Sequence, residues 1–215
     1  SRGFSYALAY TALAYTHMAD IWFSTSKSPK DSLGRAIELG QRAVALDESE
    51  PVAHAILGHF YTYAGQFDRA VAHAERGLAL DPNSSAIIYN SASALAYSGR
   101  PEEAIPLFQK AIRLNPLSSS GLYREFGQTL RDAGQFEEAV SAYKKAIQMA
   151  PDNILAHVGL AATYSLMGRE KEARAEAAEV LRINPKFSLD SLAKMLPYKD
   201  QSETDKVANA LRKAG

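Results

Sequence analysis

Three kinds of residue recur along the chain with one shared spacing. Prolines occur at positions 82, 116, 151 and 185, so that successive prolines are 34, 35 and 34 residues apart. Alanines at 70, 104, 139 and 173, and glycines at 65, 99, 134 and 168, keep the same intervals. A fixed period of this length is the sequence signature of stacked structural repeats.

Each of the three columns has a physical reason to keep its residue type. The glycines follow apolar-periodic runs such as 51–64 and 119–133, where a residue that tolerates a left-handed backbone ends a helix. The prolines close a second such run, because they have no amide proton with which to continue a helix. The alanines lie within the second run and face a small residue of the first, which is Gly58, Ala92, Gly127 or Ala161. Each period therefore predicts a hairpin of two closely packed helices.

The repeat resembles the tetratricopeptide repeat. His54, Leu57, Gly58, Tyr61, Ala70 and Pro82 follow the signature of that family, with His54 in the place of its usual tryptophan. Ala104 with Phe108, and Ala139 with Tyr143, match the second-helix part of the signature. The resemblance implies an all-α, right-handed α-solenoid of about five hairpins, since one hairpin cannot bury both of its faces alone.

We expect five repeats and a C-terminal cap. The repeats fall at about 4–50, 51–84, 85–119, 120–153 and 154–187, and together they form a solenoid over residues 1–187. The first repeat has helices at about 4–21 and 32–46, with a longer connection that contains Trp22 and Phe23. Residues 188–215 are expected to form capping helices, of which the last starts at Ser202 and uses Asp205 in a capping box. The polar outer face of this cap comes from Lys206, Asn209, Arg212 and Lys213.

Composition excludes several classes of partner. Lys and Arg total 24, as do Asp and Glu, so no basic field favours nucleic acid or an anionic membrane. No apolar run approaches the roughly 20 residues of a membrane span, and the N-terminus has no secretory pattern. The chain has no cysteine for a disulfide, a thiol nucleophile or a zinc-thiolate site. We therefore expect a cytoplasmic protein with no nucleic-acid or membrane partner.

The titratable residues do not form a catalytic or metal-binding pattern. His54 and His59 are five residues apart, so they point to different faces of a helix. Acidic pairs such as Glu102 and Glu103 lie in the first turn of a second helix, where they complement the helix dipole. No glycine-rich phosphate loop or serine-nucleophile motif is present. We predict no enzyme activity, no metal and no cofactor.

The outer face of each first helix is the predicted binding surface. The family resemblance places the first helices along the concave side, where residues four apart form stripes that join into one groove. The stripe residues are Tyr15, His59, Tyr63, Tyr89, Ser93, Tyr97, Arg124, Gln128 and Arg131. Tyrosine rings and arginines suit an extended or helical segment of a protein partner. In the alternative interpretation, Arg124 and Arg131 pair with neighbours such as Glu125 and Asp132.

A second candidate surface lies at the N-terminal end, where Tyr6, Tyr10, Trp22 and Phe23 are a heavy aromatic load. These residues either meet another domain or a second copy of the chain, or fold back over the first hairpin. The chain opens with Ser1 rather than Met, so we expect a piece of a longer protein. Its Ala- and Tyr-rich opening and its tail around 182–200 resemble repeat regions that follow nucleotide cyclase domains in multidomain bacterial proteins. That resemblance implies a regulatory or self-association domain as the alternative function.

Overall fold

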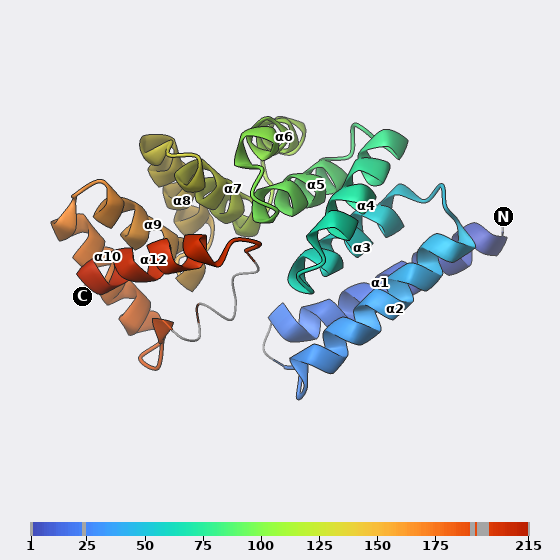
Figure 1. Ribbon diagram of the computed structural model, residues 1–215, viewed down its shortest axis with the longest axis horizontal. Coiled ribbons are helices and arrows are strands. Elements are labelled where there is room, and N and C mark those ends of the chain that lie inside the picture. Colours follow the sequence, from blue (N-terminus) through green and yellow to red (C-terminus); the bar gives the residue numbers. More distant parts are fainter. Residues whose placement is uncertain (1, 23–24, 190–191, 193–197, 215) are drawn as a thin grey trace. The chain divides into compact units, whose positions relative to one another are not determined.

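The computed structural model describes residues 2–22, 25–189, 192 and 198–214. Within these residues the chain is helical and contains no strand, as Figure 1 shows. It divides into two compact units, Ser1–Ser98 and Gly99–Gly215. None of the described helices is both long enough and apolar enough to cross a membrane.

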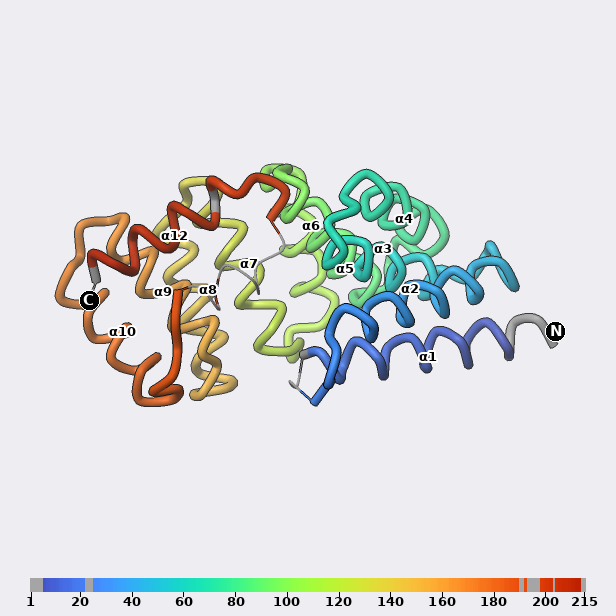
Figure 2. The backbone as a smooth tube through the Cα atoms, turned by 60° about the horizontal axis from the view of Figure 1, so that its bottom comes forward, coloured from blue at the N-terminus to red at the C-terminus, as the bar shows by residue number. Residues whose placement is uncertain are grey.

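Unit 1 contains two helical hairpins and a fifth helix. Its helices are α1 (Arg2–Trp22), α2 (Pro29–Leu46), α3 (Pro51–Tyr63), α4 (Phe67–Leu80) and α5 (Ser85–Tyr97). Helix α1 packs along α2, α3 packs along α4, and α5 lies against both α3 and α4. The tube in Figure 2 shows the antiparallel course of α1 and α2.

Unit 2 repeats the same arrangement. Its helices are α6 (Pro101–Leu114), α7 (Ser120–Asp132), α8 (Phe136–Met149), α9 (Ile154–Leu166), α10 (Glu170–Ile183) and α12 (Gln201–Ala214). Helices α7 and α8 form one hairpin, and α9 and α10 form the next. Helix α6 packs against α7, while α12 packs mainly against α9 and less extensively against α10. The predicted all-α fold class is confirmed.

The turn glycines end the first helices as predicted. Gly65, Gly99, Gly134 and Gly168 all have positive φ, between 69° and 82°. After α3, the amide of Gly65 donates to the Thr62 carbonyl at 3.0 Å, and the amide of Gln66 donates to the Tyr61 carbonyl at 2.9 Å. These two hydrogen bonds close the helix with a Schellman motif, which requires a residue that accepts the left-handed conformation.

Small residues bring the two helices of a hairpin into close contact. The repeated alanines Ala70, Ala104, Ala139 and Ala173 have no exposed surface. A Cβ atom at Gly58 would lie 2.9 Å from the carbonyl oxygen of Ala70, so the backbones of α3 and α4 touch at this point. The predicted pairing of small residues is therefore present in this hairpin.

A buried tyrosine links consecutive repeats in unit 2. Tyr143 of α8 is buried, and its ring lies against Gly127 of α7 and Gly159 of α9. A Cβ atom at Gly159 would lie 2.3 Å from this ring, which is too close for any real contact. Gly159 therefore creates the space in which Tyr143 packs.

Two helix starts differ from the sequence-based prediction. Helix α2 begins at Pro29 rather than near residue 32, because proline is well suited to the first position of a helix. Helix α12 begins at Gln201, and the carboxylate of Asp200 accepts the amide of Ser202 at 2.8 Å. The cap of α12 is therefore Asp200, and the predicted capping box of Ser202 with Asp205 was wrong.

The substitution Gly159→Ala tests the packing of Tyr143. The added methyl group should displace the tyrosine ring and lower the free energy of unfolding by about 2–3 kcal/mol, as overpacked cores do. Urea denaturation measures the change. The control is Gly34→Ala in α2, where a Cβ atom would meet nothing within 4 Å, and this variant should be neutral or slightly stabilising. Equal stability of the two variants would contradict the packing described.

Candidate protein-interaction surfaces

The predicted stripe in unit 1 forms an aromatic surface around one histidine. His59 of α3 is buried, with its ring 5.2 Å from the ring of Tyr63 and 6.5 Å from the ring of Tyr89 of α5. Tyr63 and Tyr89 are half-buried, so each presents part of its ring to the outside. The structure thus brings together stripe residues from two successive first helices.

The other stripe residues of unit 1 differ widely in exposure. Ser93 and Tyr97 of α5 are buried. Tyr15 of α1 is 50% exposed. The accessible part of the stripe therefore consists of three tyrosines, Tyr15, Tyr63 and Tyr89, and the small polar groups lie beneath the surface.

The predicted stripe in unit 2 is occupied by the chain's own residues. Arg131 is buried, and its guanidinium group donates to the Asp132 carboxylate at 2.8 and 3.0 Å. It also donates to the hydroxyl of Tyr198 at 2.8 Å, and that hydroxyl donates to Asp132 at 2.7 Å. Burial acts to lower the pKa of Arg131, but the charge of Asp132 and the surrounding oxygens hold that pKa well above its usual value. Arg131 therefore remains a cation that is neutralised within the unit.

The second arginine of this stripe is also paired within its own helix. Arg124 and Glu125 form an ion pair at 2.7 Å, and both side chains are largely buried. Gln128, one turn from Arg124, is buried as well. The ion pairs Arg124–Glu125 and Arg131–Asp132 are those of the alternative sequence interpretation, so neither guanidinium is held ready for an outside carboxylate.

The C-terminal segment explains why this stripe is covered. Val207 of α12 and Leu192 lie with Leu155 and Val158 of α9, and only about 10 Å³ of space remains among these side chains, Arg124, Gln128 and Arg131. The buried residues of α12 lie on one face of the helix, namely Thr204, Val207, Ala208, Ala210 and Leu211. On its opposite face Lys206, Asn209, Arg212 and Lys213 are exposed, as predicted. The expected cap thus also covers the first-helix side of α9.

Sequence reasoning missed this placement. The hydroxyl of Tyr198 meets Arg131 and Asp132 across 67 and 66 residues of chain, and no local pattern signals such a contact. The one signal in the sequence is that Tyr198 is an aromatic residue directly after a proline.

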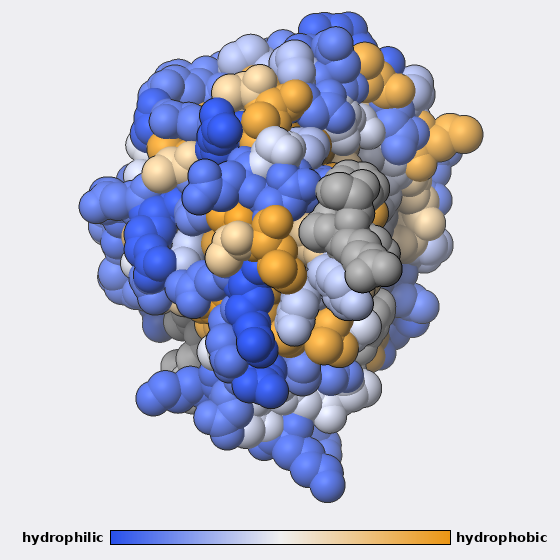
Figure 3. Space-filling model, turned by 90° about the vertical axis from the view of Figure 1, so that its right-hand side faces the viewer, coloured by the Kyte–Doolittle hydropathy of each residue, from blue (hydrophilic) through white to orange (hydrophobic). Residues whose placement is uncertain are grey.

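The N-terminal helix exposes apolar side chains on two sides of its buried stripe. Ala7, Thr11, Ala14 and Met18 are buried, whereas Tyr6 is 60% and Leu13 48% exposed on one flank. Leu8 and Tyr15 are exposed on the other flank. Figure 3 views the molecule from the side where α1 and α2 lie in Figure 1, and it shows apolar surface scattered among hydrophilic residues.

Of the other aromatic residues predicted at the N-terminal end, the structure describes the side chain of Tyr10 only. Tyr10 is half-buried beneath the guanidinium group of Arg42, which lies 5.4 Å from its ring centre. Phe23 and the side chain of Trp22 lie outside the described residues. Tyr6 is therefore the most exposed aromatic residue of the predicted set for which the structure describes a side chain.

Two histidines of the first helices bond across to their second helices. His54 Nδ1 lies 3.0 Å from His73 Nδ1, and His157 Nδ1 lies 2.6 Å from the Glu176 carboxylate. Burial and the neighbouring His54 lower the pKa of His73 to about 4, and burial lowers the pKa of His54 as well. Among the described residues there is no group of three or more His, Cys, Asp or Glu that could hold a metal ion. His54 thus lies in the core position expected from the sequence.

Comparison with known proteins gives the class of protein. Tetratricopeptide-repeat families match residues 53–86, 83–152 and 130–196, so their matches together span 53–196. The chain therefore belongs to the tetratricopeptide-repeat (TPR) family. Proteins of this family mediate protein–protein interactions. All three matching models are repeat families, and none of them is a family of enzymes.

Solved structures support the same fold. PilW, a type IV pilus biogenesis factor, is 20% identical with a TM-score of 0.73, and the match covers 97% of this chain and 90% of PilW. YrrB, described as a TPR protein with an unusual peptide-binding site, is 23% identical with a TM-score of 0.61, over 88% of this chain and 92% of YrrB. MamA is 25% identical with a TM-score of 0.60, over 73% of this chain and 91% of MamA. No curated protein matches the sequence.

The substitution Tyr198→Phe tests the contact of the C-terminal segment with α7. Loss of the hydroxyl leaves the buried pair Arg131–Asp132 short of one donor and one acceptor, which should cost about 1–2 kcal/mol. Hydrogen exchange should show faster opening of α12. The matched control is Tyr123→Phe, whose hydroxyl makes one exposed hydrogen bond of 3.3 Å to the Pro116 carbonyl. Unchanged exchange in the Tyr198→Phe variant would refute the contact.

The His54–His73 contact predicts a pH-dependent stability. Both histidines have folded-state pKa values below the ordinary 6.5, so the unfolded chain binds more protons than the folded chain between about pH 6.5 and pH 4. The free energy of unfolding should therefore be largest above pH 6.5 and fall as the pH decreases to about 4. Urea denaturation at pH 7 and pH 5 should show a smaller fall for His73→Gln than for the wild type. The same fall in both would argue against this linkage.

Proposed function

We propose that the chain is a protein-interaction module whose first-helix faces hold an amphipathic helical segment of a partner protein. The observation that carries this proposal is the position of α12 against α9 in unit 2. There a first-helix face already accommodates one amphipathic helix, which the chain itself supplies.

The contact between α12 and α9 defines what such a face accepts. Val158 and Ala162 of α9 form one apolar cluster with Val207 and Leu211 of α12. Four of the buried α12 residues have the spacing i, i+3, i+4 and i+7 of a helix laid into a groove, namely Thr204, Val207, Ala208 and Leu211. Ala210 belongs to the same apolar cluster as Val207 and Leu211. A partner helix with aliphatic residues at this spacing and a polar outer face fits the same description.

The first-helix face of unit 1 offers a different surface for the same mode of binding. Tyr63 and Tyr89 flank His59 and keep part of their rings accessible, and Tyr15 of α1 is more exposed still. Tyrosine gives a large rigid contact area at a small cost in conformational entropy, which favours anchor positions in interfaces. YrrB, with a similar fold, is described as having a peptide-binding site. We therefore assign the partner segment to this tyrosine surface.

Peptide selection on the full chain tests the assignment. A displayed library of amphipathic helices should yield binders with aliphatic residues at i, i+3, i+4 and i+7. Tyr89→Asp should weaken the binding of the selected peptides by about tenfold or more, since it replaces an aromatic contact of the proposed interface with a charge. The control is Leu117→Asp, which changes an apolar residue that is 90% exposed in the loop after α6 and should leave binding unchanged. Binders that do not distinguish Tyr89→Asp from the wild type would exclude the tyrosine surface.

A second function, self-association through α1, is favoured by the exposure of Tyr6 and Leu13. These residues are seven apart, so they lie on one side of the helix. Leu57 of α3, the counterpart of Leu13, packs against Gly40 of the preceding second helix, α2. The exposed side of α1 thus carries the same kind of residue that elsewhere meets a neighbouring hairpin. A second copy of the chain, or another domain in a regulatory arrangement, is the partner that this side suits.

Sedimentation distinguishes the two functions. If α1 drives self-association, the wild type should form dimers that dissociate in the variant Tyr6→Lys with Leu13→Lys. Leu46→Lys, at an exposed position of α2, serves as the charge control and should remain dimeric. A wild type that stays monomeric at all concentrations would remove this second function and leave the peptide-binding proposal untouched.

A further inference from the structure

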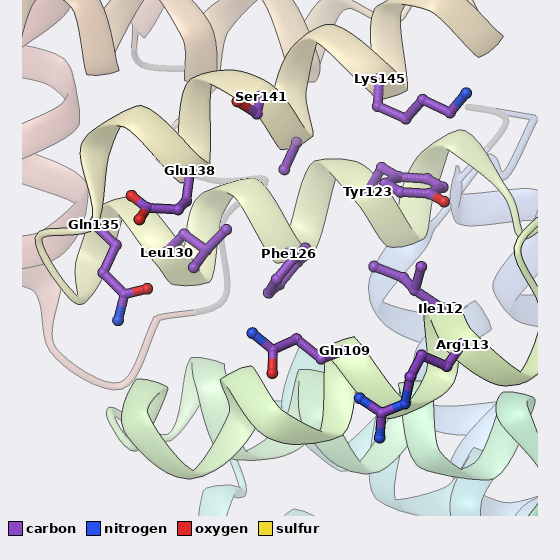
Figure 4. Close-up of a pocket in the computed structure, with 11 residues that line it drawn as sticks. Gln109, Ile112, Arg113, Tyr123, Phe126, Leu130, Gln135, Glu138, Ser141 and Lys145 are labelled. Atoms are coloured by element: carbon purple, nitrogen blue, oxygen red, sulfur yellow. The ribbon is translucent and has the colours of Figure 1, made fainter.

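A cavity of about 600 Å³ opens between the second helices α6 and α8, on the far side of α7 from its Arg124 and Arg131 stripe. Its floor is formed by Tyr123, Phe126 and Leu130 of α7, with Ile112 of α6 beside them. Figure 4 shows these apolar side chains between the two flanking helices. The volume lies within the range of about 300–1,000 Å³ that is typical of ligand sites.

Comparison with the second and fifth repeats explains why the cavity is open at this place. In two other repeats, the residue at this place in the first helix bonds to a side chain 19 positions later, as His54 does to His73 and His157 does to Glu176. The corresponding pair in the open repeat is Tyr123 and Ala142. The methyl group of Ala142 cannot reach across, so the floor stays uncovered.

Within the described residues, this repeat also has no arginine side chain stacked over an aromatic ring at the floor of the cavity. The guanidinium groups of Arg69 and Arg169 lie over the rings of Tyr61 and Tyr164, at 4.1 and 4.5 Å from the ring centres. The counterpart of these tyrosines is Leu130, which offers no ring face to a cation. Tyr123 and Phe126 consequently remain half-buried, although the ring of Phe126 is anchored 5.7 Å from that of Phe108.

The two ends of the cavity carry opposite charges. Arg113 of α6 and Lys145 of α8 lie at the Tyr123 end, and Glu138 lies at the Leu130 end (Figure 4). Lys145 donates to the Gln148 amide at 3.3 Å, and within the described part of the chain neither cation is paired with a carboxylate. The cationic end therefore favours an acidic group on whatever binds.

The polar side chains around the cavity indicate the class of ligand. Gln109, Gln135 and Ser141 line the rim, and their amide and hydroxyl groups can pair with peptide N–H and C=O groups. A simple acyl chain would form none of these hydrogen bonds. We propose that this cavity is a second binding site, which takes a peptide segment of a partner protein with two large apolar side chains followed by an acidic residue. The site is separate from the first-helix surfaces and does not depend on their function.

Methyl NMR of the full chain with labelled alanine tests the site, because the Ala142 methyl group lies at the cavity. The probes are acetyl-Ser-Leu-Ser-Phe-Glu-amide, the same peptide ending in Gln, and decanoate. The Glu peptide should shift the Ala142 signal and bind about fivefold more tightly than the Gln peptide, the effect of one or two exposed ion pairs. The double variant Arg113→Gln with Lys145→Gln should remove this difference, whereas Lys171→Gln, an exposed position of α10, should preserve it.

Filling the cavity provides an independent variant. Ala142→His introduces the residue that stands at the corresponding place in the repeat of His54. Because this substitution removes the Ala142 methyl group, its effect is measured by titration calorimetry, in which the Glu peptide should no longer bind. The charge variants alter only exposed side chains, so they keep the test valid if Ala142→His fails to fold. Absence of any Ala142 shift, equal binding of the Glu and Gln peptides, or decanoate binding as tightly as the Glu peptide would each overturn the proposal.

Discussion

Close packing at small residues of the first helices sets the distance between helices, and the surfaces on both sides of the repeat depend on it. At Gly58 and Ala70 the backbones of α3 and α4 touch, with no room for a Cβ atom on the glycine. A small residue also allows consecutive repeats to pack closely, because the absence of a side chain at Gly159 leaves space for the ring of Tyr143. Because these contacts fix the distance between helices, the large side chains of each first helix are directed either into the core or onto one of two surfaces.

The two surfaces differ because different residues close them. On the first-helix side of unit 2, α12 and Tyr198 cover the face, and Arg131 is neutralised by Asp132 within the unit. On the second-helix side, pairs such as His54–His73 and His157–Glu176 cover the floor in two repeats, and Ala142 leaves it open in a third. Different residues at equivalent positions of the repeats thus leave a surface either covered or open. The helical hairpin is the same in both cases.

The fold could be predicted from the sequence because its determinants are local and periodic. The turn glycines, the small residues between helices and the apolar spacing all lie within one period, and each has a single structural meaning. Helix starts were less secure. Pro29 occupies the first position of α2, and Asp200 rather than Ser202 caps α12.

The candidate site was harder to predict because exposure depends on residues far away in the chain. The pattern placed Tyr63, Tyr89 and Arg131 on equivalent stripes, yet Tyr63 and Tyr89 keep accessible rings and Arg131 is buried beneath Tyr198. The cavity at Ala142 was also missed, since an alanine in a helix carries no signal until it is compared with His73 and Glu176 in the other repeats. Periodicity therefore locates a face, and only tertiary contacts show whether that face is free.

The central claim is that a first-helix face of this chain holds an amphipathic helix, and the position of α12 on α9 tests it most directly. Methyl NMR can measure nuclear Overhauser effects between Val207 of α12 and Val158 of α9, two valines of one apolar cluster. The account predicts strong effects between these methyl groups in the full chain. Effects from Val207 that reach only methyl groups of α10, with none to Val158 or Leu155, would show that α12 does not lie on the first-helix face of α9 and would contradict the account.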